Sequence, residues 1–448
     1  MARSISLSRL FLRLCALALI AILVASTRAR WSGLVAGDIP AQFLLFYVLP
    51  MSGAAVALLG LSFAGRDVRL SAILSLGACI VALYGAEFYV QYQRYSHRNR
   101  VESAARHFGN AFDPRTVDQV VADLRAKGID AHPFMRILNR TTALMPLANT
   151  PNRTIVWCNE VGPYLIFHSD RNGFNNPDKI WDQIPVEIAV VGDSFVQGAC
   201  APKNDGMVDR VRASLPSVAN LGIGGNGPQS NLATLIEYTP SLRPKRIVWV
   251  HYAGNDLSGM MQDKLNPRLS RYVDEPDYTQ NLAGHAGEIT EMMERFFETE
   301  YGGTNRYEMT QMQAILKHPM NFLKFTSVRE SLGITHWDGD TVDFDLLARV
   351  FARAKSLSDT LGAEMTVISL PHALQAAREL EAPEQRLSDI VMRLGMKYMD
   401  AGAEMRRRGD TERFYTFGSY GGHLSDAGNA VLADMILQAA GKQPEKTR

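Results

Sequence analysis

The sequence predicts an α/β protein with a parallel sheet, preceded by membrane helices at its amino terminus. Beyond residue 185, apolar runs of strand length alternate with helical patterns, and most runs end in a turn of small or polar residues. Such apolar runs are typical of buried parallel strands. Binding and catalytic sites in α/β proteins lie at the carboxyl ends of these strands. The chain of 448 residues is long enough for more than one unit, and its net charge of +1 gives no support to nucleic-acid binding.

Three apolar segments predict a membrane region over residues 1–92. They cover residues 10–26, 41–63 and 70–91, and the latter two are near the roughly 20 residues that a helix needs to cross a bilayer. The first is also typical of a signal peptide, and the alternative for the other two is a pair of buried core helices. Arginines on the two sides of these segments balance, so the positive-inside rule leaves the orientation open. An amino terminus inside the cell and a cleaved signal both place the rest of the chain outside the cytoplasm.

The segments that follow lead into the predicted sheet. Residues 93–150 are rich in Arg, His and Asp, and we expect a stalk or linker there before a globular domain over residues 151–448. A short strand at residues 164–167 precedes a polar loop at residues 170–177. This loop stands directly before the first strand of the sheet, so it either borders the site or forms an ordinary surface turn.

The first strand of the sheet, residues 188–191, ends at Gly192-Asp193-Ser194. A strand, a turn of small residues and a helix in this order lift Ser194 to the carboxyl edge of the sheet. Ser194 is therefore the candidate nucleophile. The alternative is a simple strand-to-helix turn, since Gly, Asp and Ser are common turn residues.

The four cysteines separate into two pairs. Cys15 and Cys79 lie in apolar segments, whereas Cys158 and Cys200 lie in the globular part. In an oxidising compartment Cys158 and Cys200 can form a disulfide, and the alternative is two buried free thiols. Such a bridge would tie the segment before the first strand to the loop that follows Ser194.

A glycine-rich segment follows the second strand. The strand at residues 218–221 enters residues 222–228, where Gly225 is a candidate donor through its backbone N–H. A dinucleotide-binding loop is the rival interpretation, but such a motif has to open a helix, and Pro228 stands before the helix expected at residues 231–242.

The third strand, residues 246–252, ends at Asn255 and Asp256. An Asn at this place lies beside the nucleophile, where its amide is able to donate to an oxyanion. The alternative is that both residues form a turn or a helix cap.

The remainder of the chain contains an insertion and then resumes the alternation. Residues 257–340 are a long charged stretch that we expect to form a lid or a substrate-binding cap. His423 lies in the turn before the last helix, which Ser425 or Asp426 is expected to cap, and it is the candidate general base. The expected helices are residues 344–361, 383–394 and 430–439, and the expected strands are residues 365–370 and 397–399.

The other histidines give little support to different chemistry. They are scattered, with no pair at the helical spacing of metal ligands, so we expect no metal and no cofactor. His251 and His372 stand near strand ends and are weaker candidates for the base.

Four blocks of sequence together resemble the SGNH or GDSL hydrolase superfamily. Gly192-Asp193-Ser194, the loop at Gly225, Gly254-Asn255-Asp256 and residues 423–428 follow in that family's order, from about residue 170 to the end. The resemblance implies a three-layer α/β/α, flavodoxin-like fold and ester chemistry through an acyl-serine. It makes Ser194 the nucleophile, His423 the base, and Gly225, Asn255 and the Ser194 backbone N–H the oxyanion donors.

The chain departs from the family at the acid of the triad. The family usually carries an Asp three residues before the His, and this chain has Tyr420 there. Tyr420 itself, a backbone carbonyl, or an acid such as Asp256, Asp193 or Asp426 is then left to orient His423. Loss of the orienting acid lowers turnover by about ten-thousandfold, so a slow dyad and a silent binding site both stay open.

The architecture is similar to membrane-tethered SGNH domains that add or remove O-acetyl groups on bacterial polysaccharides, alginate acetylation proteins among them. This resemblance implies a serine esterase or O-acyltransferase in the bacterial inner membrane, with a periplasmic catalytic domain. The expected partners are the membrane, an acylated carbohydrate or acyl donor, and envelope polysaccharide machinery. A lipid esterase or thioesterase is the alternative, favoured by the insertion methionines Met260, Met261, Met292 and Met293. A silent glycan-binding scaffold is the non-enzymatic alternative.

Overall fold

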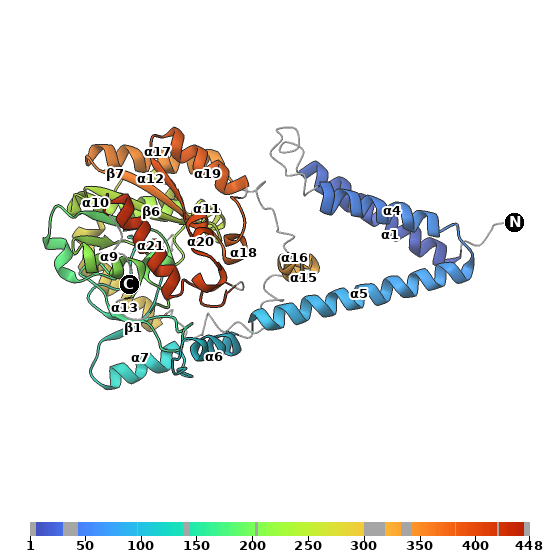
Figure 1. Cartoon of the computed structure of the whole chain (residues 1–448), viewed down its shortest axis with the longest axis horizontal. Helices are drawn as coiled ribbons and strands as arrows, with labels where there is room; N and C mark the ends of the chain where they lie inside the picture. The colour runs from blue at the N-terminus through green and yellow to red at the C-terminus, as the bar shows by residue number, and fades with distance from the viewer. Residues whose placement is uncertain are drawn as a thin grey trace. The chain divides into compact units, whose positions relative to one another are not determined.

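The chain forms two compact units. The computed structural model describes residues 6–29, 44–95, 97–137, 143–201, 205–299, 319–332, 342–380, 382–418 and 421–442. Residues 1–96 and 309–341 form the first unit, and residues 97–308 and 342–448 form the second. Figure 1 colours the chain from its amino terminus in blue to its carboxyl terminus in red.

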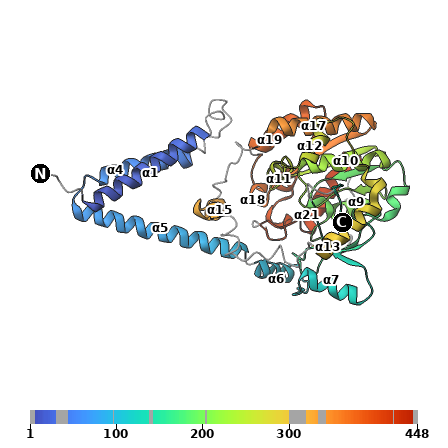
Figure 2. The same cartoon turned by 180° about the vertical axis from the view of Figure 1, so that it is seen from behind.

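The first unit contains the apolar helices. Its elements are α1 (Leu7–Ala29), η1 (Leu44–Val48), α4 (Leu49–Leu61), α5 (Arg66–Tyr95), α15 (Pro319–Leu323) and α16 (Thr326–Ser331). In both views α1 and α4 run side by side (Figure 1, Figure 2). Among the described residues, α1 and α5 are long and apolar enough to cross a membrane, which is compatible with membrane anchoring.

The middle apolar segment differs from its prediction. Residues 41–43 of the expected span lie outside the described residues, and the following five residues are π-helical. The α-helix that continues them, α4, has 13 residues, so the regular α-helical part of this segment is shorter than the roughly 20 residues of a typical span. Two helices of membrane length are therefore found in the described part of this unit, where the sequence predicted three segments.

The described parts of the predicted insertion are divided between the two units. α11 (Asp256–Asp263), α12 (Pro267–Asp274) and α13 (Ala286–Thr299) belong to the unit with the sheet, whereas α15 and α16 belong to the first unit. There the buried carboxylate of Glu87 in α5 accepts hydrogen bonds from the backbone N–H groups of Ser327 (3.0 Å) and Val328 (2.8 Å). These bonds hold the start of α16 on α5.

The second unit is built on a five-stranded sheet. Its strands are β4 (Ile188–Val191), β5 (Val218–Asn220), β6 (Arg246–Tyr252), β7 (Glu364–Leu370) and β8 (Lys397–Asp400). They pair in parallel in the order β5-β4-β6-β7-β8. Numbered along the chain, this is the 2-1-3-4-5 order of flavodoxin-like sheets. The predicted parallel α/β sheet is confirmed.

Two hydrophobic cores lie on opposite faces of this sheet. Ala189 and Val191 of β4 enter one core, and Ile188 and Val190 enter the other, as the two-residue repeat of a strand requires. The helices that close the first core are α10 (Pro228–Leu242), α17 (Phe344–Thr360) and α19 (Ala382–Arg393), and those that close the second are α9 (Met207–Ser214), α20 (Ala401–Arg408) and α21 (Asp426–Ala439). The unit therefore has three α/β/α layers.

A small accessory sheet lies in the same unit. It consists of β1 (Ala131–Pro133), β2 (Thr154–Val156) and β3 (Ile166–His168), in which β2 pairs parallel with β1 and antiparallel with β3. α6 (His97–His107) and α7 (Val117–Ala126) precede it. Buried Val120 and Val121 of α7 pack with Ala131 and Val156. The described part of residues 97–150, which we expected to form a stalk, is therefore structured and belongs to the unit with the sheet.

The polar loop before β4 is organised by Asp170, whose side chain is buried. The carboxylate accepts hydrogen bonds from the backbone N–H groups of Asn172 and Phe174 and from the side chains of Asn176 and Trp181. Asn176 also bonds the backbone of Asn220, and Asn175 donates to the Gln197 carbonyl. The loop thus fixes the end of β5 and the end of α8 (Ser194–Gln197). The remaining short helices are η2 (Asp178–Asp182), η3 (Leu282–His285), α18 (Ala373–Ala376) and η5 (Glu412–Phe414).

Candidate active site

Ser194 begins the short helix α8 at the carboxyl edge of the central sheet. Asp193 caps this helix, because its side chain accepts a hydrogen bond from the Phe195 N–H (3.0 Å). A Cβ at Gly192 would stand 2.6 Å from the Val196 side chain and 2.8 Å from the Val250 carbonyl oxygen. Only glycine therefore allows the turn that brings Ser194 to the strand end. The serine is 7% exposed.

His423 lies beside Ser194, although 229 positions separate them in the sequence. Its Nε2 atom is 3.0 Å from Ser194 Oγ. The imidazole packs against the Phe195 ring, and 21% of the side chain is exposed. Ser425 caps α21 through a hydrogen bond from the Gly428 N–H, as predicted, and so fixes the turn that carries the histidine.

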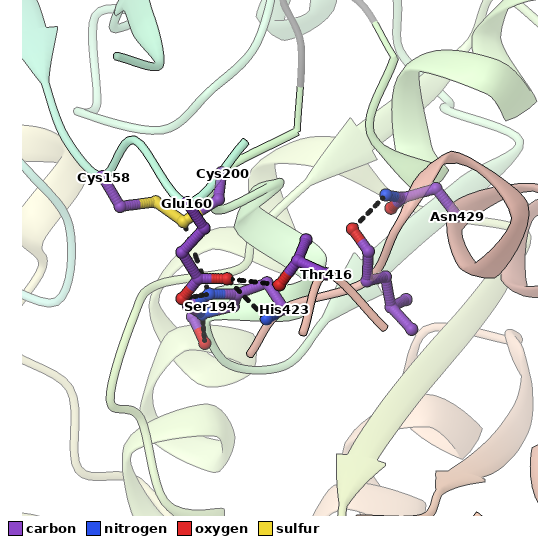
Figure 3. Close-up of a disulfide and its surroundings, with 8 residues drawn as sticks. Cys158, Glu160, Ser194, Cys200, Thr416, His423 and Asn429 are labelled. Carbon is purple, nitrogen blue, oxygen red and sulfur yellow. Dashed lines mark hydrogen bonds and ion pairs between the residues drawn. A yellow bond between two sulfur atoms is a disulfide. The ribbon is translucent and has the colours of Figure 1, made fainter. Parts of the chain in front are cut away.

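Glu160 completes a triad that the sequence analysis did not find. Its Oε1 atom is 2.9 Å from His423 Nδ1. Its Oε2 atom accepts hydrogen bonds from Thr416 Oγ1 (2.8 Å) and from the His423 backbone N–H (2.7 Å). Figure 3 shows Ser194, His423, Glu160 and Thr416 in this arrangement. A carboxylate that holds Nδ1–H leaves Nε2 free to accept the serine proton.

Glu160 comes from outside the central sheet. It stands at the tip of the hairpin that joins β2 and β3, where the Trp157 N–H donates to the Leu165 carbonyl and the Leu165 N–H donates to the Cys158 carbonyl, both at 2.9 Å. No spacing rule relative to His423 points to this position. The one usable signal was the cysteine pair, because a bridge from Cys158 to Cys200 brings residues near 160 close to the serine.

The acids that the sequence offered for this role have other partners. Asp256 pairs with His251 (3.1 Å) and accepts a hydrogen bond from the Tyr252 N–H. Asp426 pairs with Arg210. Asp193 caps α8 and lies 3.4 Å from Ser194 Oγ. Tyr420 lies outside the described residues. In the described structure it is Glu160, and none of these acids, that contacts His423 Nδ1.

The charges of the pair stabilise each other. Burial alone would raise the pKa of Glu160, but the His423 charge and the hydrogen bonds from His423 and Thr416 outweigh it and lower this pKa to about 2. Burial would likewise lower the pKa of His423, and the Glu160 carboxylate outweighs that effect and raises it above 6.5. Glu160 is therefore ionised at neutral pH, as the acid of a triad must be.

The two predicted oxyanion residues lie in the loops on either side of the nucleophile strand. Gly225 follows β5 and Asn255 follows β6, and both strands pair with β4. Gly225 is exposed, with φ of 79°, and Asn255 is also exposed. The Asn255 side chain makes no capping bond to α11 and lies near Asp193, whose pKa is raised by burial and by nearby Asp256. Asn255 therefore lies directly next to the nucleophile turn.

The glycine loop also corrects one argument made from the sequence. α10 begins at Pro228 with Gly227 as its N-cap, so the loop does open a helix and Pro228 is its first residue. Gly224 instead shows why a nucleotide is a poor occupant. A Cβ there would stand 2.7 Å from the Trp157 ring and 3.0 Å from Phe134, so side chains already cover this part of the loop.

A disulfide joins Cys158 to Cys200 next to the triad (Figure 3). Cys200 Sγ is 3.5 Å from His423 Nδ1. These three residues have the spacing of metal ligands, but both sulfur atoms are bonded to each other and are not available to a metal. Of the other candidate bases, His251 is fully buried against Asp256, and His372 accepts a hydrogen bond at the start of α18.

Comparison with known proteins adds no family assignment. No protein-family model matches the chain, and no curated protein matches it. Among solved structures, the crystal structure of LAE5, an α/β-hydrolase enzyme from the metagenome of Lake Arreo in Spain, is similar to 58% of this chain over 98% of its own length, with 14% sequence identity and a TM-score of 0.31. The function therefore has to be inferred from the geometry of the site itself.

Proposed function

We propose that this protein is an SGNH-type serine esterase or O-acyltransferase that works through an acyl-serine. The observation that carries the proposal is the continuous line of hydrogen bonds from Ser194 through His423 to Glu160. A nucleophile bonded to a base, and a base oriented by a carboxylate, is the arrangement that activates a serine hydroxyl.

The proposed reaction has two halves. Ser194 Oγ attacks the ester carbonyl carbon while its proton passes to His423 Nε2, and the carbonyl oxygen becomes an oxyanion near the Ser194 N–H, Gly225 and Asn255. The carbon–oxygen bond of the ester then breaks, and the leaving alcohol takes the proton from Nε2. In the second half, water or a sugar hydroxyl gives its proton to Nε2 and attacks the acyl-serine. Ser194 recovers the proton as the acyl group leaves, so water yields hydrolysis and a sugar yields transfer.

Two features support an extracytoplasmic carbohydrate as the substrate of the proposed enzyme. The apolar helices α1 and α5 are compatible with membrane anchoring. The Cys158–Cys200 disulfide fits an oxidising compartment, such as a bacterial periplasm. O-acetyl groups on an envelope polysaccharide are the substrate class that we propose, with the polysaccharide machinery as partner. Of the methionines that had favoured a lipid substrate, Met260 and Met293 are fully buried in the core, whereas Met261 and Met292 are partly exposed.

The full-length protein in detergent allows a direct test with a fluorophosphonate probe. We expect one probe per chain, located at Ser194 by peptide mapping, and acetate release from O-acetylated polysaccharide. Adding a deacetylated glycan acceptor then separates transfer from hydrolysis, because transfer moves the acetyl group to the acceptor. A folded protein that takes up no probe, under conditions in which a control serine esterase reacts, would contradict the proposal.

The rate of probe labelling should rise with pH. His423 accepts the serine proton only in its neutral form, and the Glu160 carboxylate raises its pKa above 6.5. Labelling is therefore slow below this pKa and reaches its plateau above it, with a midpoint higher than 6.5. Second-order labelling rates measured from about pH 5 to 9 test this expectation. A midpoint at or below the ordinary histidine value would show that Glu160 does not act on His423.

A further inference from the structure

The hairpin that carries Glu160 is bonded mainly to its own accessory layer. Around its tip, the Asn159 side chain donates to the Asp113 carbonyl, the Asn110 side chain donates to the Val161 carbonyl, and the Asp113 N–H donates to the Gly162 carbonyl. All these partners lie between α6 and α7. They hold the tip together but give it no fixed place against the central sheet.

In the described part of the chain, apolar packing and a covalent bond join this tip to the nucleophile region besides the Glu160 carboxylate. Trp157 and Leu165 share a small apolar cluster with Ala199 and Cys200, and the Trp157 ring also packs edge-on against His423 and covers Gly224. These apolar contacts favour burial of the hairpin, but the hydrophobic effect is not directional and does not align a carboxylate with an imidazole. The covalent bond between Cys158 and Cys200 adds a fixed link, because it holds their Cα atoms 5.2 Å apart.

We propose that the Cys158–Cys200 disulfide is the positioning element of the triad, which keeps Glu160 on His423 so that only the oxidised chain has a complete site. This inference rests on the proposed function. Glu160 follows Cys158 by two residues, a reach of at most about 7 Å of extended chain. Cys200 follows Ser194 by six residues. The disulfide thus links the segment that carries Glu160 to the segment that carries Ser194.

The energy of the buried carboxylate explains why such a link is useful. The Glu160 side chain is 11% exposed. Burial of a charge costs solvation free energy, and this cost is offset only if hydrogen-bond and ion-pair partners are well placed. All three partners, Thr416 Oγ1, the His423 N–H and His423 Nδ1, belong to the segment before α21. If the hairpin moves outward, the carboxylate recovers water and His423 loses its orienting acid.

Reduction would also place a competing group at the histidine. Two electrons and two protons from a dithiol convert the disulfide into two thiols, and the dithiol closes into its own disulfide. The Cys200 sulfur, now 3.5 Å from Nδ1 in the structure, becomes a thiol beside His423. A thiolate next to an imidazolium is a stable ion pair, and the protonated histidine in this pair cannot accept the serine proton.

A double-mutant cycle with fluorophosphonate labelling tests this inference. The four proteins are the wild type, Cys158→Ala/Cys200→Ala, Glu160→Gln, and the combined variant. If the disulfide acts through Glu160, its loss lowers the labelling rate about tenfold to a hundredfold in the wild-type background and hardly at all in the Glu160→Gln background. The pH midpoint also falls towards 6.5, since the carboxylate no longer raises the pKa of His423. An equal loss in both backgrounds, with the midpoint unchanged, would overturn the inference and leave the bond a purely structural role.

Reduction of the folded wild type with dithiothreitol provides the second arm, which does not depend on how the alanine variant folds. Alkylation counted by mass spectrometry distinguishes Cys15 and Cys79, which are free before reduction, from Cys158 and Cys200. We expect slow labelling after reduction and recovery after reoxidation, whereas full-rate labelling of the reduced protein would overturn the inference. If the oxidised wild type takes up no probe at all, the proposed function fails; if it labels and reduction changes nothing, only the inference fails.

Discussion

Replacing Ser194 or His423 by Ala is expected to lower ester turnover by about a millionfold, which is the scale seen when either member of a serine–histidine pair is removed. The two side chains share a hydrogen bond of 3.0 Å, so the loss of either one removes the activated hydroxyl. Turnover of an acetyl ester and uptake of a fluorophosphonate measure the effect. Both variants should lose both activities, and the double variant should be no worse than either single variant, because the pair acts as one group.

Matched controls separate this effect from general damage to the protein. Ser356 in α17 is exposed, and His285 is partly exposed and pairs with Glu288 on the surface of the same unit. Ser356→Ala and His285→Ala should therefore retain wild-type labelling. Stoichiometric probe uptake by the Ser194→Ala protein would show that another serine is the nucleophile, and unaltered labelling of His423→Ala would remove the histidine from the mechanism.

The central sheet could be predicted because each of its strands carries a local signal. β4, β6 and β7 are nearly continuous apolar runs, as strands covered on both faces must be. The positions of Ser194 and His423 follow from similar local signals, since one follows a strand end and the other precedes a capped helix. These positions depend on local chain geometry, which short sequence patterns such as turn residues and helix caps indicate.

Glu160 could not be predicted in this way, because its role depends on tertiary packing alone. It lies in a short hairpin of a three-stranded sheet that precedes the α/β repeat, and it meets His423 across 263 positions. The family resemblance directed attention to Tyr420, three residues before the histidine. Yet Cys158 and Cys200 were recognised as a candidate disulfide, and Glu160 lies only two residues after Cys158. Cysteine pairs near a nucleophile are thus informative about which distant segments reach the site.

The middle apolar segment shows a different limit of sequence reasoning. Hydropathy over residues 41–63 predicts a span, but it does not register local helix geometry. The structure has a π-helical stretch at Leu44–Val48 that continues directly into the short helix α4. Hydropathy therefore indicated the apolar segment but not where its helix departs from regular α geometry.

Replacing Glu160 by Gln is expected to lower the labelling rate by about ten-thousandfold, although the two side chains have almost the same shape. Two donors, Thr416 Oγ1 and the His423 N–H, point at Oε2. They will hold the amide oxygen, so the amide NH₂ group must face His423 Nδ1. An NH₂ donor there requires Nδ1 to be the acceptor, which moves the proton to Nε2. The histidine then has no lone pair towards Ser194 and cannot accept its proton.

The tautomer of His423 is the observable that distinguishes this mechanism from a loss of stability. Nitrogen-15 spectra of the imidazole should show Nδ1–H in the wild type and Nε2–H in Glu160→Gln, while thermal melting shows that both proteins are folded. Glu294→Gln is the matched control, because Glu294 is a more exposed partner of Arg153 in the same unit and should change neither the rate nor the tautomer. Glu160→Asp keeps the charge but shortens the reach to Nδ1, and a smaller loss is expected from it than from the glutamine. If Glu160→Gln labels at the wild-type rate with the wild-type tautomer, the carboxylate is not the orienting group, and the short contact to His423 has no catalytic consequence.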